Sequence, residues 1–135
     1  MSAEANLAAV RKIYEAFGQG DVETILGMLA DEVDWAAEAT GDAAPWYGRR
    51  TNRDQVAAFF AEIGGALQVQ EFTPKSFAAN DDGEVMAVIG FKVTVQATGR
   101  EAEMEIHHYW RFEGGKVVRY RGTEDTAQMK EALAG

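Results

Sequence analysis

The sequence contains no cysteine and only 2 prolines among its 135 residues. The missing thiols exclude disulfides, cysteine nucleophiles and thiolate metal sites, and they fit a reducing compartment. Also missing are a run of about 18 apolar residues, which a membrane span needs, and a charged leader followed by an apolar core. We therefore expect a soluble, cytoplasmic protein without a membrane partner.

Positive charge is scarce, because 13 lysines and arginines stand against 22 aspartates and glutamates, for a formal net charge of −9. Proteins that bind nucleic acids carry clustered basic residues. No basic run here is longer than the pair Arg49 and Arg50. Phosphate-binding loops, dinucleotide fingerprints, G-x-S-x-G elbows and H-E-x-x-H motifs are also absent from the sequence. Nucleic acids are therefore excluded as expected partners, and these common cofactor and hydrolase classes are not indicated.

The first half of the chain has the spacing of helices. With 47% hydrophobic residues, a chain of this length forms one domain with a single core. Apolar residues recur with helical period over 4–18 and 22–29, and again in a third helix that follows Thr51 or Asn52 and runs to about Ile63. The two glycines that come next are expected to end this third helix.

From residue 66 onward the period changes from 3.6 to 2, which is the period of a β-strand. Three glycine-containing turns divide this part into strands at about 67–79, 84–97, 101–112 and 116–124. The short connections favour antiparallel hairpins. A short extended piece over 32–37 and a closing helix over 126–133 complete the pattern. The sequence thus predicts one α+β domain, 1–135, with three N-terminal helices packed on a curved antiparallel sheet.

The predicted strand at 101–112 has the strongest site signal. Alternate residues of a strand face opposite sides, so one face presents Met104, Ile106, His108, Trp110 and Phe112 and the other presents Glu103, Glu105, His107, Tyr109 and Arg111. His108 is an imidazole on an apolar face, where it needs hydrogen-bond partners or a lowered pKa. It is either a general acid or base, or a core histidine bonded to a buried tyrosine or a backbone carbonyl.

Three stretches resemble a known family: VRKIYEAFGQGDVETILGMLADEVDW, PWYGR and HHYWRFEGGKVVRYR. They resemble the SnoaL-like branch of the nuclear transport factor 2-like superfamily, which also holds ketosteroid isomerases and limonene epoxide hydrolases. The resemblance covers nearly the whole chain. It implies a cone-shaped, cystatin-like fold, a pocket between helices and sheet, and a homodimer through the outer face of the sheet. One fold can host many reactions, so the resemblance does not name one.

The residues that perform catalysis in ketosteroid isomerases are not matched here. Those enzymes use an aspartate base, a tyrosine and a protonated aspartic acid. Aligned on this sequence, the three positions fall near Ala37, at Ile13 and at His108, so steroid isomerisation is not expected. In SnoaL-like cyclases a histidine on these strands works with an acid, and the resemblance implies that His108 is that histidine.

The expected catalytic residues are His108, Glu38, Glu124 and Tyr14. The carboxylate that would partner His108 stays open between Glu38, Asp34 and Glu124, and Tyr14 or a water would stabilise an enolate. The expected substrate-binding residues are mostly aromatic: Trp35, Trp46, Tyr47, Phe59, Phe91, Met104, Ile106, Trp110 and Tyr120. Trp46 and Tyr47 are expected to form a lid near the entrance.

The expected function is a small enzyme without cofactors that binds an apolar, carbonyl-containing molecule and catalyses proton transfer, as an isomerase, a cyclase or a dehydratase. A metal site is not expected, because His107 and His108 point to opposite faces. Two alternatives stay open: a non-catalytic binding protein that uses the same cavity, and a dimeric scaffold whose cavity is filled. A cavity of roughly 300 Å³ or more, with His108 and a carboxylate within about 3 Å of each other, would favour the enzyme or the binder. A filled cavity would favour the scaffold.

Overall fold

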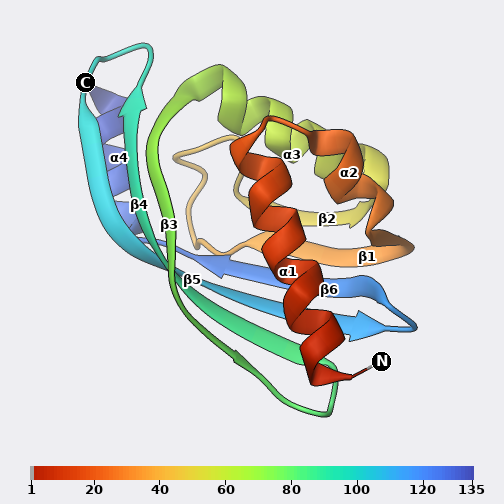
Figure 1. Cartoon of the computed structure of the whole chain (residues 1–135). Helices are drawn as coiled ribbons and strands as arrows, with labels where there is room; N and C mark the ends of the chain where they lie inside the picture. Colours follow the sequence, from red (N-terminus) through yellow and green to blue (C-terminus); the bar gives the residue numbers. More distant parts are fainter. Residues whose placement is uncertain (1) are drawn as a thin grey trace.

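The computed structural model describes residues 2–135, which form four helices and one six-stranded sheet (Figure 1). The helices are α1 (Ala3–Gly18), α2 (Val22–Gly27), α3 (Arg53–Ala66) and α4 (Thr126–Ala134). The strands are β1 (Leu29–Ala37), β2 (Gly48–Asn52), β3 (Leu67–Ala79), β4 (Glu84–Val95), β5 (Glu101–Glu113) and β6 (Lys116–Thr123). Their order in the sheet is β2-β1-β6-β5-β4-β3.

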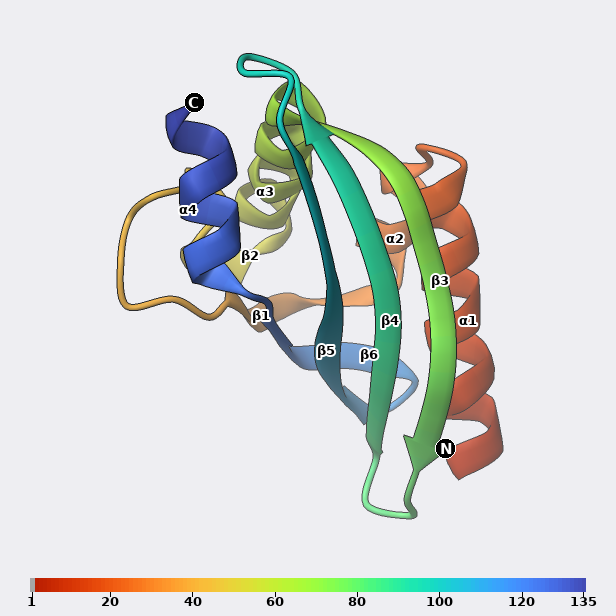
Figure 2. The same cartoon turned by 90° about the vertical axis from the view of Figure 1, so that its left-hand side faces the viewer.

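The sheet curves around three helices, as Figures 1 and 2 show. Helices α1, α2 and α3 lie on its concave side, whereas α4 lies apart from them against β5. The α+β prediction is confirmed, with one addition: β1 runs parallel to β6, while all other neighbouring strands are antiparallel. No helix within residues 2–135 has both the length and the apolar character that crossing a membrane requires.

Side-chain caps start the helices where polar residues precede the apolar pattern. Asn52, rather than Thr51, caps α3, and its side chain accepts a hydrogen bond from the Gln55 N–H at 2.9 Å. The prediction that two glycines end α3 is wrong, because the helix continues through them to Ala66. The Gln96 amide donates to the carbonyls of Gly64 and Leu67 at 3.1 and 3.2 Å, so the end of α3 does not need a glycine cap.

Strand β2 lies in a segment for which the sequence predicted no strand. Its residues, Gly-Arg-Arg-Thr-Asn, are mostly exposed and lack apolar alternation, so the two-residue period gave no signal. It pairs antiparallel with β1 at the edge of the sheet. This pairing ties the loop before β2, which carries Trp46 and Tyr47, to the inner side of β1.

Small residues flank His108 in the sheet. Across the strands its neighbours are Ala87 on β4 and Gly122 on β6. A Cβ atom at Gly122 would collide with the hydroxyl of Tyr120 and would lie 3.4 Å from the His108 ring. Glycine at this position therefore makes room for the imidazole and the phenol side by side on the concave face.

Candidate active site

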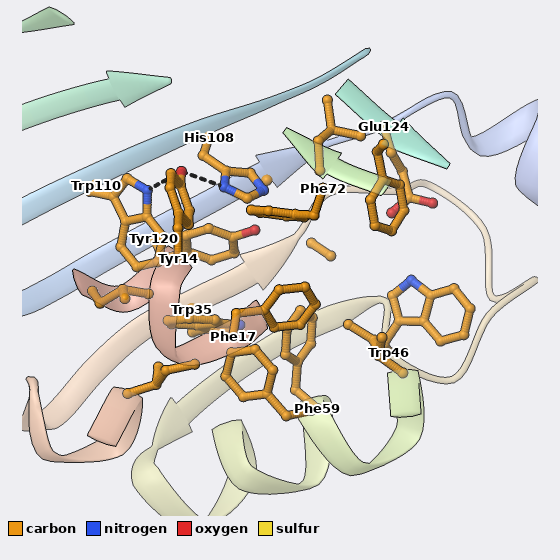
Figure 3. Close-up of a pocket in the computed structure, with 18 of the residues that line it drawn as sticks. Tyr14, Phe17, Trp35, Trp46, Phe59, Phe72, His108, Trp110, Tyr120 and Glu124 are labelled. Atoms are coloured by element: carbon orange, nitrogen blue, oxygen red, sulfur yellow. Dashed lines mark hydrogen bonds between the residues drawn. The ribbon is translucent and has the colours of Figure 1, made fainter. Parts of the chain in front are cut away.

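An apolar cavity lies between the helices and the concave face of the sheet (Figure 3). Its walls are largely aromatic, and its titratable side chains are Tyr14, His108, Tyr120 and Glu124. The volume of the cavity is about 80 Å³. This is well below the roughly 300 Å³ typical of sites for drug-sized ligands, and below the roughly 150 Å³ of a cavity that binds benzene. In this state the cavity accommodates only a few non-hydrogen atoms, and it does not reach the volume expected from the sequence for an enzyme or a binder.

A chain of two hydrogen bonds ends at His108 (Figure 3). The Trp110 indole N–H donates to the Tyr14 hydroxyl at 3.0 Å, and this hydroxyl lies 2.8 Å from His108 Nδ1. An indole nitrogen can only donate, so the Tyr14 oxygen is the acceptor in the first bond and keeps its own hydrogen for the second. We therefore assign Nδ1 of His108 as the acceptor, which places the ring hydrogen on Nε2.

The His108 ring is neutral at physiological pH. Burial lowers its pKa from the ordinary 6.5 to about 3, and the charge of neighbouring His107 adds to the effect. Among the hydrogen bonds of residues 2–135, none involves Nε2 of His108, although the ring borders the cavity. His108 is thus positioned to donate a hydrogen bond to a ligand, and it is a poor base at neutral pH.

The tyrosines of the cavity also stay neutral. Burial raises the pKa of the Tyr14 hydroxyl, an effect that the hydrogen bond from Trp110 partly offsets. Burial likewise raises the pKa of Tyr120 well above its ordinary value. Tyr120 stacks on Trp35 with ring centroids 4.1 Å apart. The Trp35 indole nitrogen is buried and, within residues 2–135, has no hydrogen-bond partner, so one buried donor next to the cavity is left unsatisfied.

Glu124 directly follows β6 and brings a carboxyl group to the cavity. Its oxygen accepts a hydrogen bond from the Tyr47 hydroxyl at 2.8 Å. Burial raises the pKa of Glu124, against the lowering effect of hydrogen bonds from Tyr47 and Trp46. The carboxyl group is therefore closer to titrating near neutral pH than an exposed glutamate, and this suits a group that accepts or donates a proton.

The model of the SnoaL-like domain matches residues 10–120. The chain belongs to the SnoaL-like family. No curated protein matches it in sequence.

Solved structures similar to this SnoaL-like chain agree in fold. A nuclear transport factor 2-like protein of unknown function from Burkholderia pseudomallei K96243 is 28% identical, with 100% of both chains covered and a TM-score of 0.89. A nuclear transport factor 2-like protein from Burkholderia xenovorans LB400 is 22% identical, with 98% of both chains covered and a TM-score of 0.86. A protein named as a candidate polyketide cyclase, from Xanthomonas campestris pv. campestris, is 18% identical over 98% of this chain and 99% of that one, with a TM-score of 0.79.

Most residues that the sequence proposed for the site border the cavity of this SnoaL-like domain. Three of the four expected catalytic residues do so: Tyr14, His108 and Glu124. The expected substrate-binding residues that do so are Trp35, Trp46, Phe59, Phe91, Ile106, Trp110 and Tyr120. Tyr47 and Met104 are not among the lining residues. Tyr47 instead holds Glu124, and the Met104 sulfur accepts the backbone N–H of Asp125 at 3.4 Å.

Two of the three carboxylates considered as partners of His108 face away from the cavity. Trp35 and Ala37 on β1 point toward the cavity. Because alternate residues of a strand face opposite sides, Asp34, and Glu38 directly after the strand, are expected to point away from it. The Arg121 guanidinium lies 2.8 Å from Asp34 and 3.0 Å from Glu38. Although burial acts to raise the pKa of Asp34, the hydrogen bond and charge of Arg121 hold it below its ordinary value. Glu38, which was expected in the site, therefore does not line the cavity of this structure and pairs with Arg121 instead.

Sequence reasoning missed several lining residues, among them Phe17, Phe60 and Phe72. Phe17 and Phe60 follow the helical period of α1 and α3, so an inward position could be predicted for them, but their place beside the cavity could not. Phe72 lies on β3 between two irregularities in the pairing with β4. Such bulges change which residues face inward, and the two-residue period alone does not reveal them.

Proposed function

We propose that this SnoaL-like protein binds an apolar carbonyl compound in the cavity and, without a cofactor, moves a proton on the carbon next to the carbonyl. The observation that supports this most is the Trp110–Tyr14–His108 chain. It leaves a neutral N–H group at the cavity wall without a protein partner. When a proton leaves the carbon, negative charge gathers on the carbonyl oxygen, and a prepositioned donor in an apolar site stabilises that charge strongly.

Glu124 is the proposed proton acceptor. Among residues 2–135 it is the only carboxylate that lines the cavity. Burial raises its pKa, which brings its basicity closer to what removal of a proton from carbon requires. Tyr47 holds the carboxyl group in place through the 2.8 Å hydrogen bond. His108 would then bind the oxygen while Glu124 removes the proton.

The names of structural neighbours are compatible with this chemistry. They include candidate polyketide cyclases and a candidate isomerase from Rhodopseudomonas palustris. Isomerisation, aldol-type cyclisation and dehydration can all begin with removal of a proton next to a carbonyl. Each of these neighbours is under 25% identical to this chain, so their names support the reaction class and no particular substrate.

A non-catalytic binding protein is the second candidate. The N–H group of His108, which has no hydrogen-bond partner among residues 2–135, would orient a ligand equally well without any reaction. Catalysis differs from binding because it also needs the carboxylate of Glu124.

Deuterium exchange separates the two candidates. In D₂O, the protein should exchange the protons next to the carbonyl of 2-butanone and its longer homologues faster than buffer does, as followed by proton NMR. Glu124→Gln should lower this rate about 100-fold or more, and His108→Phe should lower it by a similar factor. Ketone affinity of Glu124→Gln should stay within about tenfold of the original protein.

Glu38→Gln is the matched control, because the same change is made on a carboxylate outside the cavity. It should leave the exchange rate unchanged. Ketone binding without any exchange would reject the enzyme in favour of the binding protein. Absence of both would reject the proposed ligand class.

A further inference from the structure

A second hollow adjoins the cavity. This outer cleft is open, has a volume of about 510 Å³, and lies between the end of α1, the start of α2, the end of α3 and the start of β3. Figure 1 shows that α1 ends beside the junction of α3 and β3. The outer cleft is therefore about six times larger than the inner cavity of about 80 Å³.

The two hollows share one wall. Phe17, Phe60, Ile63 and Phe72 line both of them, and each of these side chains is half-buried. Phe17 contacts Phe72 and Phe60, with ring centroids 4.9 and 6.1 Å apart. Because a single layer of side chains separates the two volumes, rotamer changes in this layer are enough to connect them.

The inner cavity alone accommodates only a small carbonyl compound. It is smaller than a cavity that holds benzene, roughly 150 Å³, so it takes a carbonyl group and its neighbouring carbons and little more. The other side of the cavity is closed by Trp46, which is 2% exposed, and by the hydrogen bond from Tyr47 to Glu124. The remainder of a larger ligand has room in the outer cleft.

We propose that the substrate is a neutral aliphatic carbonyl compound that spans both hollows, with its carbonyl end at His108 and an unbranched chain that passes the shared wall into the outer cleft. This rests on the proposed function. An unbranched chain is favoured because it needs the narrowest opening in the aromatic layer. A neutral chain is favoured because Glu71 is the only charged residue that lines the cleft among residues 2–135, so a terminal carboxylate would be repelled.

The proposed path also differs from the lid that the sequence suggested. Tyr47 holds Glu124 in place through its hydrogen bond, whereas the last turn of α3 contains two glycines. Gly64 and Gly65 lie in its last turn, where glycine lowers helix stability. Ile63 of the shared wall directly precedes these two glycines.

Binding of a homologous series tests this inference. Dissociation constants of 2-alkanones from 2-butanone to 2-undecanone are measured by ligand-observed NMR titration. Affinity should rise about two- to fourfold for each methylene group that enters the outer cleft, and then level off when the chain reaches solvent.

Gly64→Phe should remove this dependence on chain length. A Cβ atom at Gly64 has open space around it, and Gly64 lines the cleft. The added phenyl ring should therefore fill the part of the outer cleft that the alkyl chain of the ligand would occupy. Binding of 2-butanone, which does not reach the outer cleft, should not change. Gly65→Phe is the matched control: its Cβ also has open space, yet this glycine does not line the cleft. Val69→Glu, at a position that is 37% exposed on the cleft side, gives a second test should Gly64→Phe not fold.

Affinity that does not depend on chain length, or a dependence that Gly64→Phe and Val69→Glu leave unchanged, would overturn the inference. The proposed function would survive this result if 2-butanone still exchanges its protons. Chain-dependent binding without exchange would instead retain the cleft as a binding site and reject the proton transfer. No binding of any ketone would reject both.

Discussion

Replacing Tyr14 by phenylalanine removes one oxygen atom from the centre of the hydrogen-bond chain. Two hydrogen bonds are lost, of 3.0 Å to Trp110 and 2.8 Å to His108. Trp110 is 2% exposed, so its indole N–H is left buried without a partner. An unsatisfied buried donor costs about 1–3 kcal/mol, and we expect Tyr14→Phe to lower the free energy of unfolding by this amount.

The same substitution should change the protonation pattern of His108. In the original protein, ¹⁵N NMR of the imidazole should show a bare Nδ1 and a protonated Nε2. Without the Tyr14 hydroxyl, Nδ1 loses its hydrogen-bond donor, so the tautomer with hydrogen on Nδ1 should become populated. The spectrum of His108→Gln supplies the assignment.

Tyr109→Phe is the matched control. Its hydroxyl donates to Glu84 on the outer face of the sheet, where water can replace the lost partner, so the cost should stay below about 0.5 kcal/mol. Both free energies come from urea denaturation. Equal costs for the two variants, together with an unchanged His108 tautomer, would refute the proposed direction of the hydrogen bonds.

Two further predictions concern pH and assembly. The pKa of His108 is lowered from 6.5 to about 3 in the folded protein. Between these two pH values the unfolded chain binds a proton at this residue and the folded chain does not. The contribution of His108 to the free energy of unfolding is therefore complete above pH 6.5 and is lost as the pH falls toward 3. The free energy of unfolding relative to His108→Gln should therefore be about 2–3 kcal/mol smaller at pH 4.5 than at pH 7.5 in urea denaturation, and a pH-independent difference would contradict the neutral state of this half-buried ring. We also expect a homodimer through the outer face of the sheet, where Arg111 and Arg119 lie opposite each other on β5 and β6. Asp34 of the same chain lies 3.9 Å from Arg119, and carboxylates such as Glu103 and Glu105 of a second copy would add to the pairing of the two arginines. Arg111→Glu combined with Arg119→Glu should raise the dimer dissociation constant at least tenfold in sedimentation equilibrium, and a monomeric original protein would contradict the expectation.

Periodicity predicted the fold well because burial on one side of each element fixes its pattern. It placed the starts of β3, β4, β5 and β6 at the observed residues. It failed for β2, whose exposed edge position imposes no apolar alternation. It also failed at the end of α3, where the side chain of Gln96, 32 positions from Gly64 and 29 from Leu67 in the sequence, donates hydrogen bonds to the carbonyls of these two residues. Neither the pairing of β2 with β1 nor the hydrogen bonds from Gln96 can be predicted from the neighbouring residues in the sequence.

Part of the site could be predicted because the periodicity of a strand shows which of its residues face inward. The inward position of His108 followed from its strand, and a bond to a buried tyrosine was one of the two interpretations of this residue. That the tyrosine is Tyr14, 94 positions away in sequence, depends on how α1 packs across the sheet. Parity along β1 could have excluded Glu38, since Trp35 already required the inward face. The cavity volume depends on how the aromatic rings interlock, and composition does not determine this.

The two titratable groups of the proposed reaction, His108 and Glu124, are shifted by the same physical cause. Burial lowers the pKa of His108 and raises that of Glu124, and in both cases the uncharged form is favoured. In the proposed reaction, an ionised Glu124 gives the cavity one negative charge. When Glu124 takes the proton from carbon, this charge moves to the carbonyl oxygen near the His108 N–H, and its total does not change. An apolar cavity therefore does not have to accommodate an additional charge during the reaction, and the buried donor faces the oxygen at the moment when the charge arrives. A histidine protonated at rest would instead attract the Glu124 carboxylate and stabilise the ground state, so the lowered pKa of His108 is consistent with its role as a donor.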